Sequence, residues 1–291
     1  MSKKILITGT SGGFGTLTAK TLLNKGHVVA ASMRNIHTKN KQIADELKSL
    51  GAQIVEIDVT DNESVIAGVA KSIEQMSGLD VVVNNAGVGV LGIQESFTDA
   101  DFHKVFDINV FGVQRVNRAA LPYLRNQGSG LLIQISSLLG RIALPFYGPY
   151  HAPKWAVEAL AENYRVELSG FGIDSVIVEP GGYPTTFMNN LVRPSDVSRN
   201  ETLGDFAKAP QQLFDSFEGA LASNPAQNPQ QVADAITQLI ETPAGQRPVR
   251  TIVDNMGMGT HLHPYNEQLD QIHAGTYNAF GMGDMLKLKI N

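Results

Sequence analysis

The sequence predicts an α/β protein with a Rossmann-like, doubly wound parallel sheet of about seven strands and helices on both faces. Three observations predict this fold class. Short apolar runs alternate with helix-like segments along most of the chain. The run at 79–83 is nearly continuous, as expected for a parallel strand that is covered on both faces. The first strand leads directly into the glycine-rich turn Gly9-Thr10-Ser11-Gly12-Gly13-Phe14-Gly15, which an apolar-periodic helix follows.

Each expected element rests on the period of its apolar residues and on the turn residues that end it. Strands are expected at 3–8, 27–31, 52–57, 79–83, 131–135, 173–178 and 249–253. Helices are expected at 16–25, 39–50, 61–76, 98–107, 110–124, 150–169, 185–196, 203–221 and 228–241. The last forty residues or so show no strong periodicity. We expect one dinucleotide-binding domain over residues 1–291, with a substrate-binding helical insertion at about 185–225 and a C-terminal tail at about 255–291.

Composition excludes several classes of function. Of the 291 residues, 43% are hydrophobic and 18% are charged, which indicates a globular protein with a sizeable core. The net charge of −5 gives no reason to expect binding to nucleic acid or to an anionic membrane. The chain contains no cysteine, which excludes disulfides and thiolate chemistry. The first apolar run, Ile5-Leu6-Ile7, is too short for a signal peptide or a membrane span, so we expect a cytoplasmic protein.

Most polar and glycine residues that interrupt the pattern follow predicted strands, where ligands bind on such sheets. In the first turn, the glycines allow backbone N–H groups to approach a pyrophosphate at the start of a helix. The second strand is followed by Arg34 and Asn35, without an acid that could bind the ribose 2′-hydroxyl of NAD. Because guanidinium pairs well with phosphate, we expect NADP(H) as the cofactor.

Tyr150 and Lys154 are four residues apart, so they lie on the same face if the segment is helical. A free tyrosine has a pKa of about 10, and a nearby cation lowers that pKa by stabilising the phenolate. The pair would form a usable general acid and base. Pro153 is tolerated most easily in the first turn of a helix, which predicts that this helix begins near Tyr150.

Six motifs in this order resemble the short-chain dehydrogenase/reductase family, single-domain branch, over about residues 3–253. They are Thr8-Gly9-x-x-x-Gly13-x-Gly15, Asn84-Asn85-Ala86-Gly87, Asn109, Ser137, Tyr150-x-x-x-Lys154 and Pro180-Gly181. Because Gly12 precedes Gly13, the turn also fits the T-G-x-x-G-x-x-G spacing of the extended branch, which includes sugar-nucleotide epimerases. The Asn84–Gly87 motif and the modest chain length favour the single-domain branch.

The resemblance implies a catalytic role for four residues. Tyr150 would donate a proton to a carbonyl oxygen, or take one from an alcohol. Lys154 would lower the pKa of Tyr150 and bind the nicotinamide ribose. Ser137 would hold the substrate oxygen, and Asn109 would anchor a water-mediated proton path.

The resemblance also implies contacts with the cofactor. Gly9, Thr10, Ser11, Gly13, Phe14 and Gly15 would surround the phosphates, and Arg34 and Asn35 the adenosine 2′-position. Asp58 and Val59 would contact the adenine, whereas Asn85, Ala86 and Gly87 would lie along the adenosine ribose. Pro180, Gly181, Tyr183 and Thr185 would meet the carboxamide and the phosphates. Tyr183 stands where relatives have a small aliphatic residue.

The candidate substrate pocket is apolar, which predicts a hydrophobic ketone, aldehyde or secondary alcohol as the substrate. Its expected lining residues are Leu138, Leu139, Phe146, Tyr147, Tyr183, Phe187 and Met188, with Val88, Val90 and Leu144 beside them. Ser32-Met33-Arg34-Asn35 and Lys154-Trp155-Ala156-Val157-Glu158 resemble the hydroxysteroid and retinol dehydrogenase group and many bacterial carbonyl reductases. Relatives are usually dimers or tetramers, so we expect a homodimer or homotetramer. The spacing of His261, His263 and His273 does not predict a metal site.

Two other functions fit the same fold. A non-catalytic dinucleotide sensor would not need Asn109, Ser137, Tyr150 and Lys154 together, so their presence argues against it. An epimerase or dehydratase with tightly held NAD is disfavoured by Arg34, which stands in place of an acid.

Overall fold

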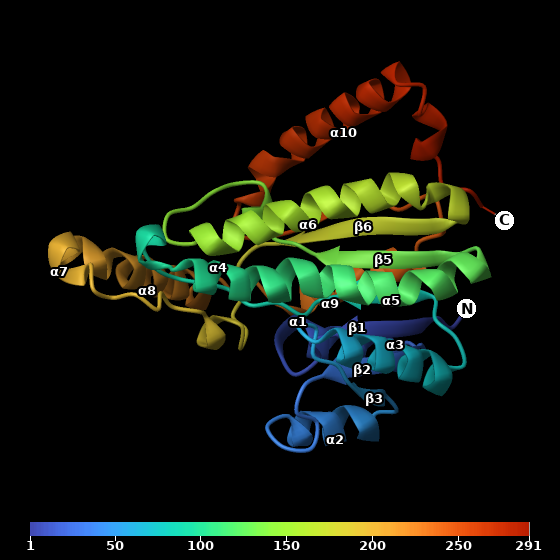
Figure 1. The fold of residues 1–291 in the computed structure, drawn as a ribbon, viewed down its shortest axis with the longest axis horizontal. Coiled ribbons are helices and arrows are strands. Elements are labelled where there is room, and N and C mark those ends of the chain that lie inside the picture. The colour runs from blue at the N-terminus through green and yellow to red at the C-terminus, as the bar shows by residue number, and fades with distance from the viewer. Residues whose placement is uncertain (291) are drawn as a thin grey trace.

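A computed structural model describes residues 1–290, which form a seven-stranded parallel sheet with helices on both faces (Figure 1). The strands are β1 (Lys4–Thr8), β2 (Val28–Met33), β3 (Gln53–Glu56), β4 (Val81–Asn84), β5 (Gly130–Ile135), β6 (Ile173–Pro180) and β7 (Arg250–Val253). Their order is β3-β2-β1-β4-β5-β6-β7, and all neighbours pair in parallel. The chain runs outward from β1 to β3, returns to β4, and then runs outward to β7. The topology therefore reverses between β1 and β4, and the predicted fold class is confirmed.

Alternate residues of each central strand supply the two cores of the protein. Ile5 and Ile7 of β1 face one core, and Leu6 faces the other. The first core is covered by α1 (Gly13–Asn24), α2 (Lys41–Ser49) and α9 (Gln230–Glu241). The second is covered by α3 (Asn62–Met76) and α5 (Gly112–Gln127), with α6 (Gly148–Glu167) packed alongside on β6. Because both faces are buried, the strands contain the near-continuous apolar runs that the sequence shows.

The two helices expected at 98–107 and 110–124 form one continuous helical segment. α4 (Asp99–Phe106) begins at a capping box, in which the Thr98 hydroxyl accepts from the Asp101 amide and the Asp101 carboxylate accepts from the Thr98 amide. A single π-helical turn, Asp107–Phe111, joins α4 to α5. Such turns widen a helix locally and are frequent at functional sites. Asn109 lies in this turn.

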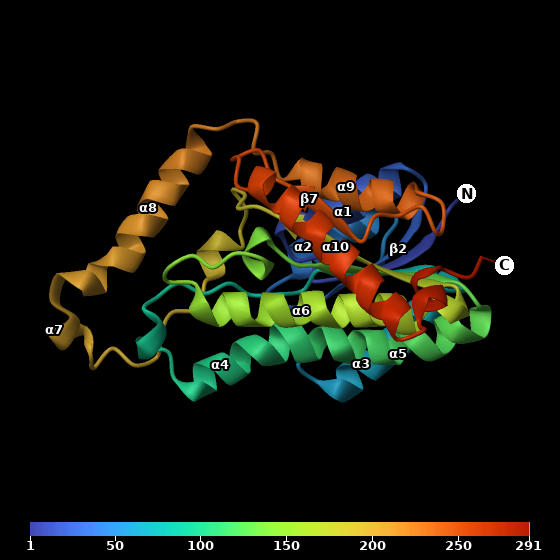
Figure 2. The same ribbon diagram turned by 90° about the horizontal axis from the view of Figure 1, so that it is seen from above.

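The prediction of a helix at 185–196 is wrong. Only a 3₁₀ turn, Met188–Asn190, forms there, and the chain is extended at Val192. Val192 pairs with Val90 instead, because its amide donates to Gly89 O (2.9 Å) and its carbonyl accepts from Leu91 N (3.0 Å). The helix expected at 203–221 is divided into α7 (Asn200–Leu203), a 3₁₀ segment at Gly204–Lys208, and α8 (Ala209–Ala222). Figure 2 shows α7 and α8 projecting away from the sheet.

The C-terminal segment contains a helix that the sequence pattern did not predict, α10 (Leu262–Ala279). Leu262 and Asn266 are its buried residues, so it lacks the apolar stripe by which a packed helix is found. It crosses above α6 in Figures 1 and 2. Among the helices of residues 1–290, none has both the length and the apolar character needed to cross a membrane.

Candidate active site

The glycine-rich turn between β1 and α1 fits tightly against the segment that follows β4. Gly9 has a φ of +72°, and a Cβ there would lie 2.7 Å from Ala86 Cα. A Cβ on Gly15 would lie 2.4 Å from Gly9 O. The Asn85 side-chain amide donates to Thr8 O (2.9 Å) and to Gly9 O (3.0 Å), which holds the two segments together. Glycine is therefore required at positions 9 and 15 for steric reasons.

This turn opens into a cavity of about 540 Å³ that extends across the carboxyl ends of the central strands. Ser11, Gly12, Gly13 and Phe14 line it at the start of α1. Within residues 1–290, no side chain caps this helix, and no acidic residue lies in its first turn. Its exposed N–H groups and helix dipole are suited to an anionic group such as a pyrophosphate. The turn therefore fits the phosphates of a dinucleotide.

One end of the cavity, beyond β2 and β3, is lined by two basic residues, Arg34 and Lys39. Arg34 lies 3.5 Å from the Asp58 carboxylate, and both line the cavity with Asn35 and Val59. Burial opposes the charge of Asp58, but hydrogen bonds from Thr60 and the Arg34 guanidinium lower its pKa overall.

Lys39 and Asn40 also line this end, and sequence reasoning missed them. Asn35 has a φ of +54°, and its amide donates to the Glu56 carboxylate (2.7 Å), which turns the chain back. The Asn40 side chain then donates to Arg34 O (2.7 Å) and closes the loop. Asn35 was the residue from which this turn could have been predicted, because asparagine tolerates the left-handed conformation that the turn requires.

Ser137, Tyr150 and Lys154 line the middle of the cavity. Tyr150 and Lys154 lie on α6, and the Lys154 ammonium is 5.5 Å from the centre of the Tyr150 ring. Lys154 Nζ donates to Ile135 O (2.7 Å) at the end of β5. The Ser137 hydroxyl accepts from Leu139 N (3.1 Å). The structure thus brings together three of the four residues expected to be catalytic.

The start of α6 differs from the expectation. The helix begins at Gly148 with Pro149 in its first turn, so Pro153 lies in the second turn rather than the first. Proline there removes one backbone hydrogen bond within the helix. The predicted start near Tyr150 is two residues late, but Tyr150 and Lys154 still share one face.

Burial shifts the pKa values of Tyr150 and Lys154, the central pair of the cavity, in opposite directions. It raises the pKa of Tyr150, and a hydrogen bond with the Ser137 hydroxyl opposes this only in part. Burial also lowers the pKa of Lys154 to about 8, with the negative charge of Glu158 acting in the opposite direction. The expected lowering of the Tyr150 pKa by Lys154 is therefore not found. The physical reason is that burial disfavours the phenolate, whereas the Lys154 ammonium donates to the Ile135 carbonyl rather than to the Tyr150 hydroxyl.

Asn109 lies behind the cavity wall and does not line it. Its side chain accepts from Val88 N and donates to Val88 O, both at 2.8 Å. The π-helical turn directs this amide toward the segment after β4. Asn109 therefore fixes the position of Val88, which does line the cavity.

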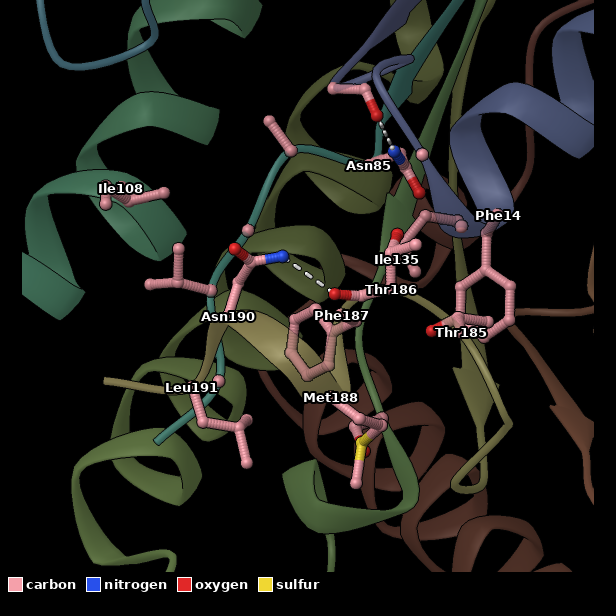
Figure 3. A pocket seen from close by; sticks show the side chains of 18 of the residues that line it. Phe14, Asn85, Ile108, Ile135, Thr185, Thr186, Phe187, Met188, Asn190 and Leu191 are labelled. Carbon is pink, nitrogen blue, oxygen red and sulfur yellow. Dashed lines mark hydrogen bonds between the residues drawn. The ribbon is translucent and has the colours of Figure 1, made fainter. Parts of the chain in front are cut away.

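The substrate half of the cavity is lined mainly by apolar side chains. Of the expected residues, it contains Val88, Val90, Leu138, Leu139, Leu144, Tyr147, Tyr183, Phe187 and Met188. Figure 3 shows Phe14 and Thr185 on one side of this pocket and Ile108 and Leu191 on the other. The Asn190 side chain donates to Thr186 O (2.8 Å) across the turn that carries Phe187 and Met188.

Three expected contact residues lie outside the cavity lining. Phe146 has a φ of +72° and packs on Phe206, with 5.8 Å between ring centres, so it faces away. Thr10 is fully buried and its hydroxyl donates to Ser32 O (3.1 Å). Gly15 lies beneath the turn, in contact with Gly9.

Phe217 of α8 and Met258, just before α10, line the pocket without having been expected. The Phe217 ring occupies the space where a Cβ on Gly182 would lie, 2.1 Å from that position. No local pattern could have found these residues, because only the tertiary fold brings α8 and the C-terminal segment to the strand ends. In the described part of the chain, no group of three potential metal ligands is found.

A parallel sheet whose glycine-rich turn lies at the topological switch point, beside a partly buried tyrosine and a buried lysine, defines an α/β protein with a Rossmann-like fold. The family model of the short chain dehydrogenases matches residues 3–196. This chain belongs to that family of oxidoreductases.

Two relatives and one solved structure illustrate the similarity. An uncharacterized oxidoreductase of Bacillus subtilis, YusZ, is 34% identical over 255 residues, which are 82% of this chain and 85% of YusZ. Human retinol dehydrogenase 8 is 33% identical over 249 residues, covering 82% of this chain and 78% of the enzyme. A short-chain dehydrogenase of Streptomyces avermitilis has a similar structure, with a TM-score of 0.76 and 26% identity over 97% of this chain and 99% of that chain.

Proposed function

We propose that this protein is an NADP(H)-dependent oxidoreductase that acts on a hydrophobic ketone, aldehyde or secondary alcohol. One observation carries the proposal: Tyr150, Ser137 and Lys154 line a single cavity, together with the glycine-rich turn after β1 and a set of mainly apolar side chains. When bound, the nicotinamide supplies or accepts the hydride. The protein residues orient the substrate and move a proton.

Tyr150 is placed to act as the acid in the direction of reduction. Because burial raises its pKa, the phenol holds its proton near neutral pH and can donate it to a carbonyl oxygen. Ser137 offers a second hydroxyl beside it, which can hold the same oxygen by a hydrogen bond. Lys154 supplies a cation that stabilises the negative charge that forms on Tyr150 after proton transfer.

The two cations beyond β2 support NADP(H) over NAD(H). Arg34 and Lys39 are both exposed at the cavity edge, where a phosphate would be within their reach. A guanidinium and an ammonium together match the charge of a 2′-phosphate better than either does alone. Asp58, which pairs with Arg34, keeps the guanidinium at the edge of the cavity.

The apolar lining supports a hydrophobic substrate. Leu138, Leu139 and Phe187 leave a reacting carbonyl with Tyr150 and Ser137 as its polar partners, so an apolar body would be held by burial. Retinol dehydrogenase 8, by its name, acts on an apolar alcohol of this class. We infer that the insertion at about 185–225 and the C-terminal tail help to form the pocket, since Phe217 and Met258 line it. A cytoplasmic location and a homodimeric or homotetrameric state stay predictions.

The test is a screen of hydrophobic ketones and alcohols with both cofactors, followed by absorbance of the reduced nicotinamide. Tyr150→Phe should lower kcat by about 10²- to 10⁴-fold while the dissociation constant for NADPH, measured by fluorescence, changes little. Tyr147→Phe is the matched control, because Tyr147 also lines the cavity and loses the same hydroxyl. It should change KM more than kcat. Normal turnover by Tyr150→Phe would overturn the mechanism.

A further inference from the structure

Beneath the central pair lies a buried group of charged side chains, here called the ionic cluster: Arg141, Glu158, Glu162, Glu179 and Arg250. Glu158 and Glu179 are at most 1% exposed, and both guanidinium groups are also buried. Transfer of so many charges out of water is costly, and buried ion pairs contribute little net stability. Their best-supported role is to hold one specific geometry. The elements that they join therefore indicate what the cluster does.

Arg141 joins three segments of the active site. Its guanidinium lies 2.6 Å from Glu158 and 2.8 Å from Glu162 of α6, and 3.3 Å from Glu179 of β6. Arg141 itself follows Ser137 by four residues, Glu158 follows Lys154 by four, and Glu179 precedes Pro180 directly. One side chain thus fixes the spacing of the segments that carry the serine, the lysine and the turn after β6.

The C-terminal helix α10 completes the ionic cluster from outside. The Asn266 side chain donates to Glu179 (2.8 Å), and Asp270 pairs with Arg250 (2.7 Å). Arg250 in turn lies 3.3 Å from Glu158 and also pairs with Glu162. Figure 2 shows α10 running from beside β7 toward the C-terminal part of α6. Because only Leu262 and Asn266 of α10 are buried, these polar contacts make up much of its attachment.

The ionic cluster and its immediate neighbours hold more carboxyl groups than guanidinium groups. Two guanidinium groups face the carboxyl groups of Glu158, Glu162 and Glu179, and Asp270 of α10 adds a fourth carboxyl beside Arg250. Burial, and then the charge of Glu158, raise the pKa of Glu179 to about 8. Its buried position therefore disfavours the charged form of Glu179.

We propose that Arg141 and Asn266 are positioning residues, through which helix α10 and the ionic cluster hold Ser137, Lys154 and the turn at Pro180 in their working geometry. This inference rests on the proposed oxidoreductase function for its effect on turnover. The coupling of α10 to these segments does not depend on that function. Neither Arg141 nor Asn266 lines the cavity, so each acts through the residues it holds.

The test compares Asn266→Ala with Glu267→Gln on the same helix, because the Glu267 side chain is exposed. Asn266→Ala should lower kcat by about 10-fold, while KM and the dissociation constant for NADPH stay within about two-fold, since misplaced reacting groups slow chemistry more than binding. Hydrogen exchange should become faster at residues 138–141 and 180–182. Glu267→Gln should change neither kcat nor the rate of hydrogen exchange at these residues.

Arg141→Lys provides a second variant that keeps the positive charge. A lysine ammonium lacks the planar fork of donors that meets three carboxyl groups at once, so kcat should fall by a similar factor with cofactor binding retained. If both variants lowered only the melting temperature, with kcat and local exchange unchanged, the role would be structural and the proposal overturned. If the wild-type protein turned over no carbonyl or alcohol, the proposed function would fail. The exchange data would still decide whether α10 is coupled to these segments.

Discussion

The Lys154 ammonium donates a hydrogen bond of 2.7 Å to Ile135 O and lies 5.5 Å from the centre of the Tyr150 ring. It thereby joins α6 to the end of β5 at the middle of the cavity. The same position removes the ammonium from water, which lowers the pKa of Lys154 to about 8. A group with this shift has a defined effect on stability as the pH changes.

Lys154→Met should reveal that effect. The folded protein releases the Lys154 proton near pH 8, whereas the unfolded chain keeps it up to about pH 10.5. The unfolded state thus binds more protons between these values, so the stability of the wild type should rise with pH relative to Lys154→Met. The full gain is at most about 3 kcal/mol, from the shift of 10.5 to about 8. The free energy of unfolding by urea, measured from pH 7 to pH 10.5, checks the prediction.

The control for that series is Lys71→Met, which removes an exposed lysine from α3. Its stability difference from the wild type should stay nearly constant over the same pH range, because its environment changes little on folding. A difference for Lys154→Met that stayed equally flat would show that Lys154 is not a buried cation.

Arg34→Ala and Lys39→Ala should each weaken binding of NADPH by about 10-fold, and the double variant by more, because each removes a charge-assisted contact to phosphate. Binding of NADH should change by less than about two-fold. Titration by fluorescence with both cofactors measures the dissociation constants of these three variants. Lys41→Ala is the control, since Lys41 pairs with Asp45 on α2 and does not line the cavity. Equal losses for both cofactors would contradict a 2′-phosphate site.

Gly9→Ala should destabilise the protein more than Gly26→Ala does. Both glycines have positive φ, +72° and +79°, so alanine is strained at either position by about 1 kcal/mol. At Gly9 the new methyl would also lie 2.7 Å from Ala86 Cα, whereas at Gly26 no described atom lies within 4 Å. We expect an additional loss of about 2 kcal/mol at Gly9, with loss of dinucleotide binding. Thermal unfolding and cofactor titration of the two variants provide the comparison, and similar melting temperatures would refute it.

Tyr183→Phe should leave the free energy of unfolding unchanged or raise it by about 1 kcal/mol. Tyr183 is 2% exposed, and its hydroxyl has no hydrogen-bond partner among residues 1–290. Burial, together with the charge of Asp254, raises its pKa to about 12, so the hydroxyl stays neutral. The ring, which meets Phe14 edge to face at 5.5 Å, is kept in the variant.

Tyr164→Phe is its matched control, because the Tyr164 hydroxyl donates to Gln114 (2.6 Å). That variant should lose about 0.5–1 kcal/mol in the same urea titration. A clear loss of stability on Tyr183→Phe would mean that its hydroxyl does have a partner in solution.

Sequence patterns predicted the sheet well, because its strands are local. Each strand is a short apolar run with its own ending, and the period of its residues does not depend on distant contacts. The predicted strand positions agree with the seven strands to within about three residues at each end. The helices on both faces were predicted from the period of their apolar residues in the same way, except where a segment packs poorly on the core.

The predictions that failed concern segments whose structure depends on contacts with distant parts of the chain. The segment at 185–196 has a helical pattern, but Val192 finds Val90 as an extended partner, and that contact is decided in space. α10 has no apolar stripe because polar contacts to Glu179 and Arg250 hold it, so periodicity could not reveal it. Phe217 and Met258 reach the cavity from segments far from its motifs.

The sequence by itself determined the strands of the sheet, the glycine-rich turn and the spacing of Tyr150 and Lys154. Short-range sterics and the period of the apolar residues are sufficient for these features. Only the tertiary structure determined the pKa shifts of Tyr150 and Lys154 and the lining of the pocket by Phe217 and Met258. Desolvation depends on everything that surrounds a group, and the groups around Lys154 come from β5, α6 and the ionic cluster beneath them.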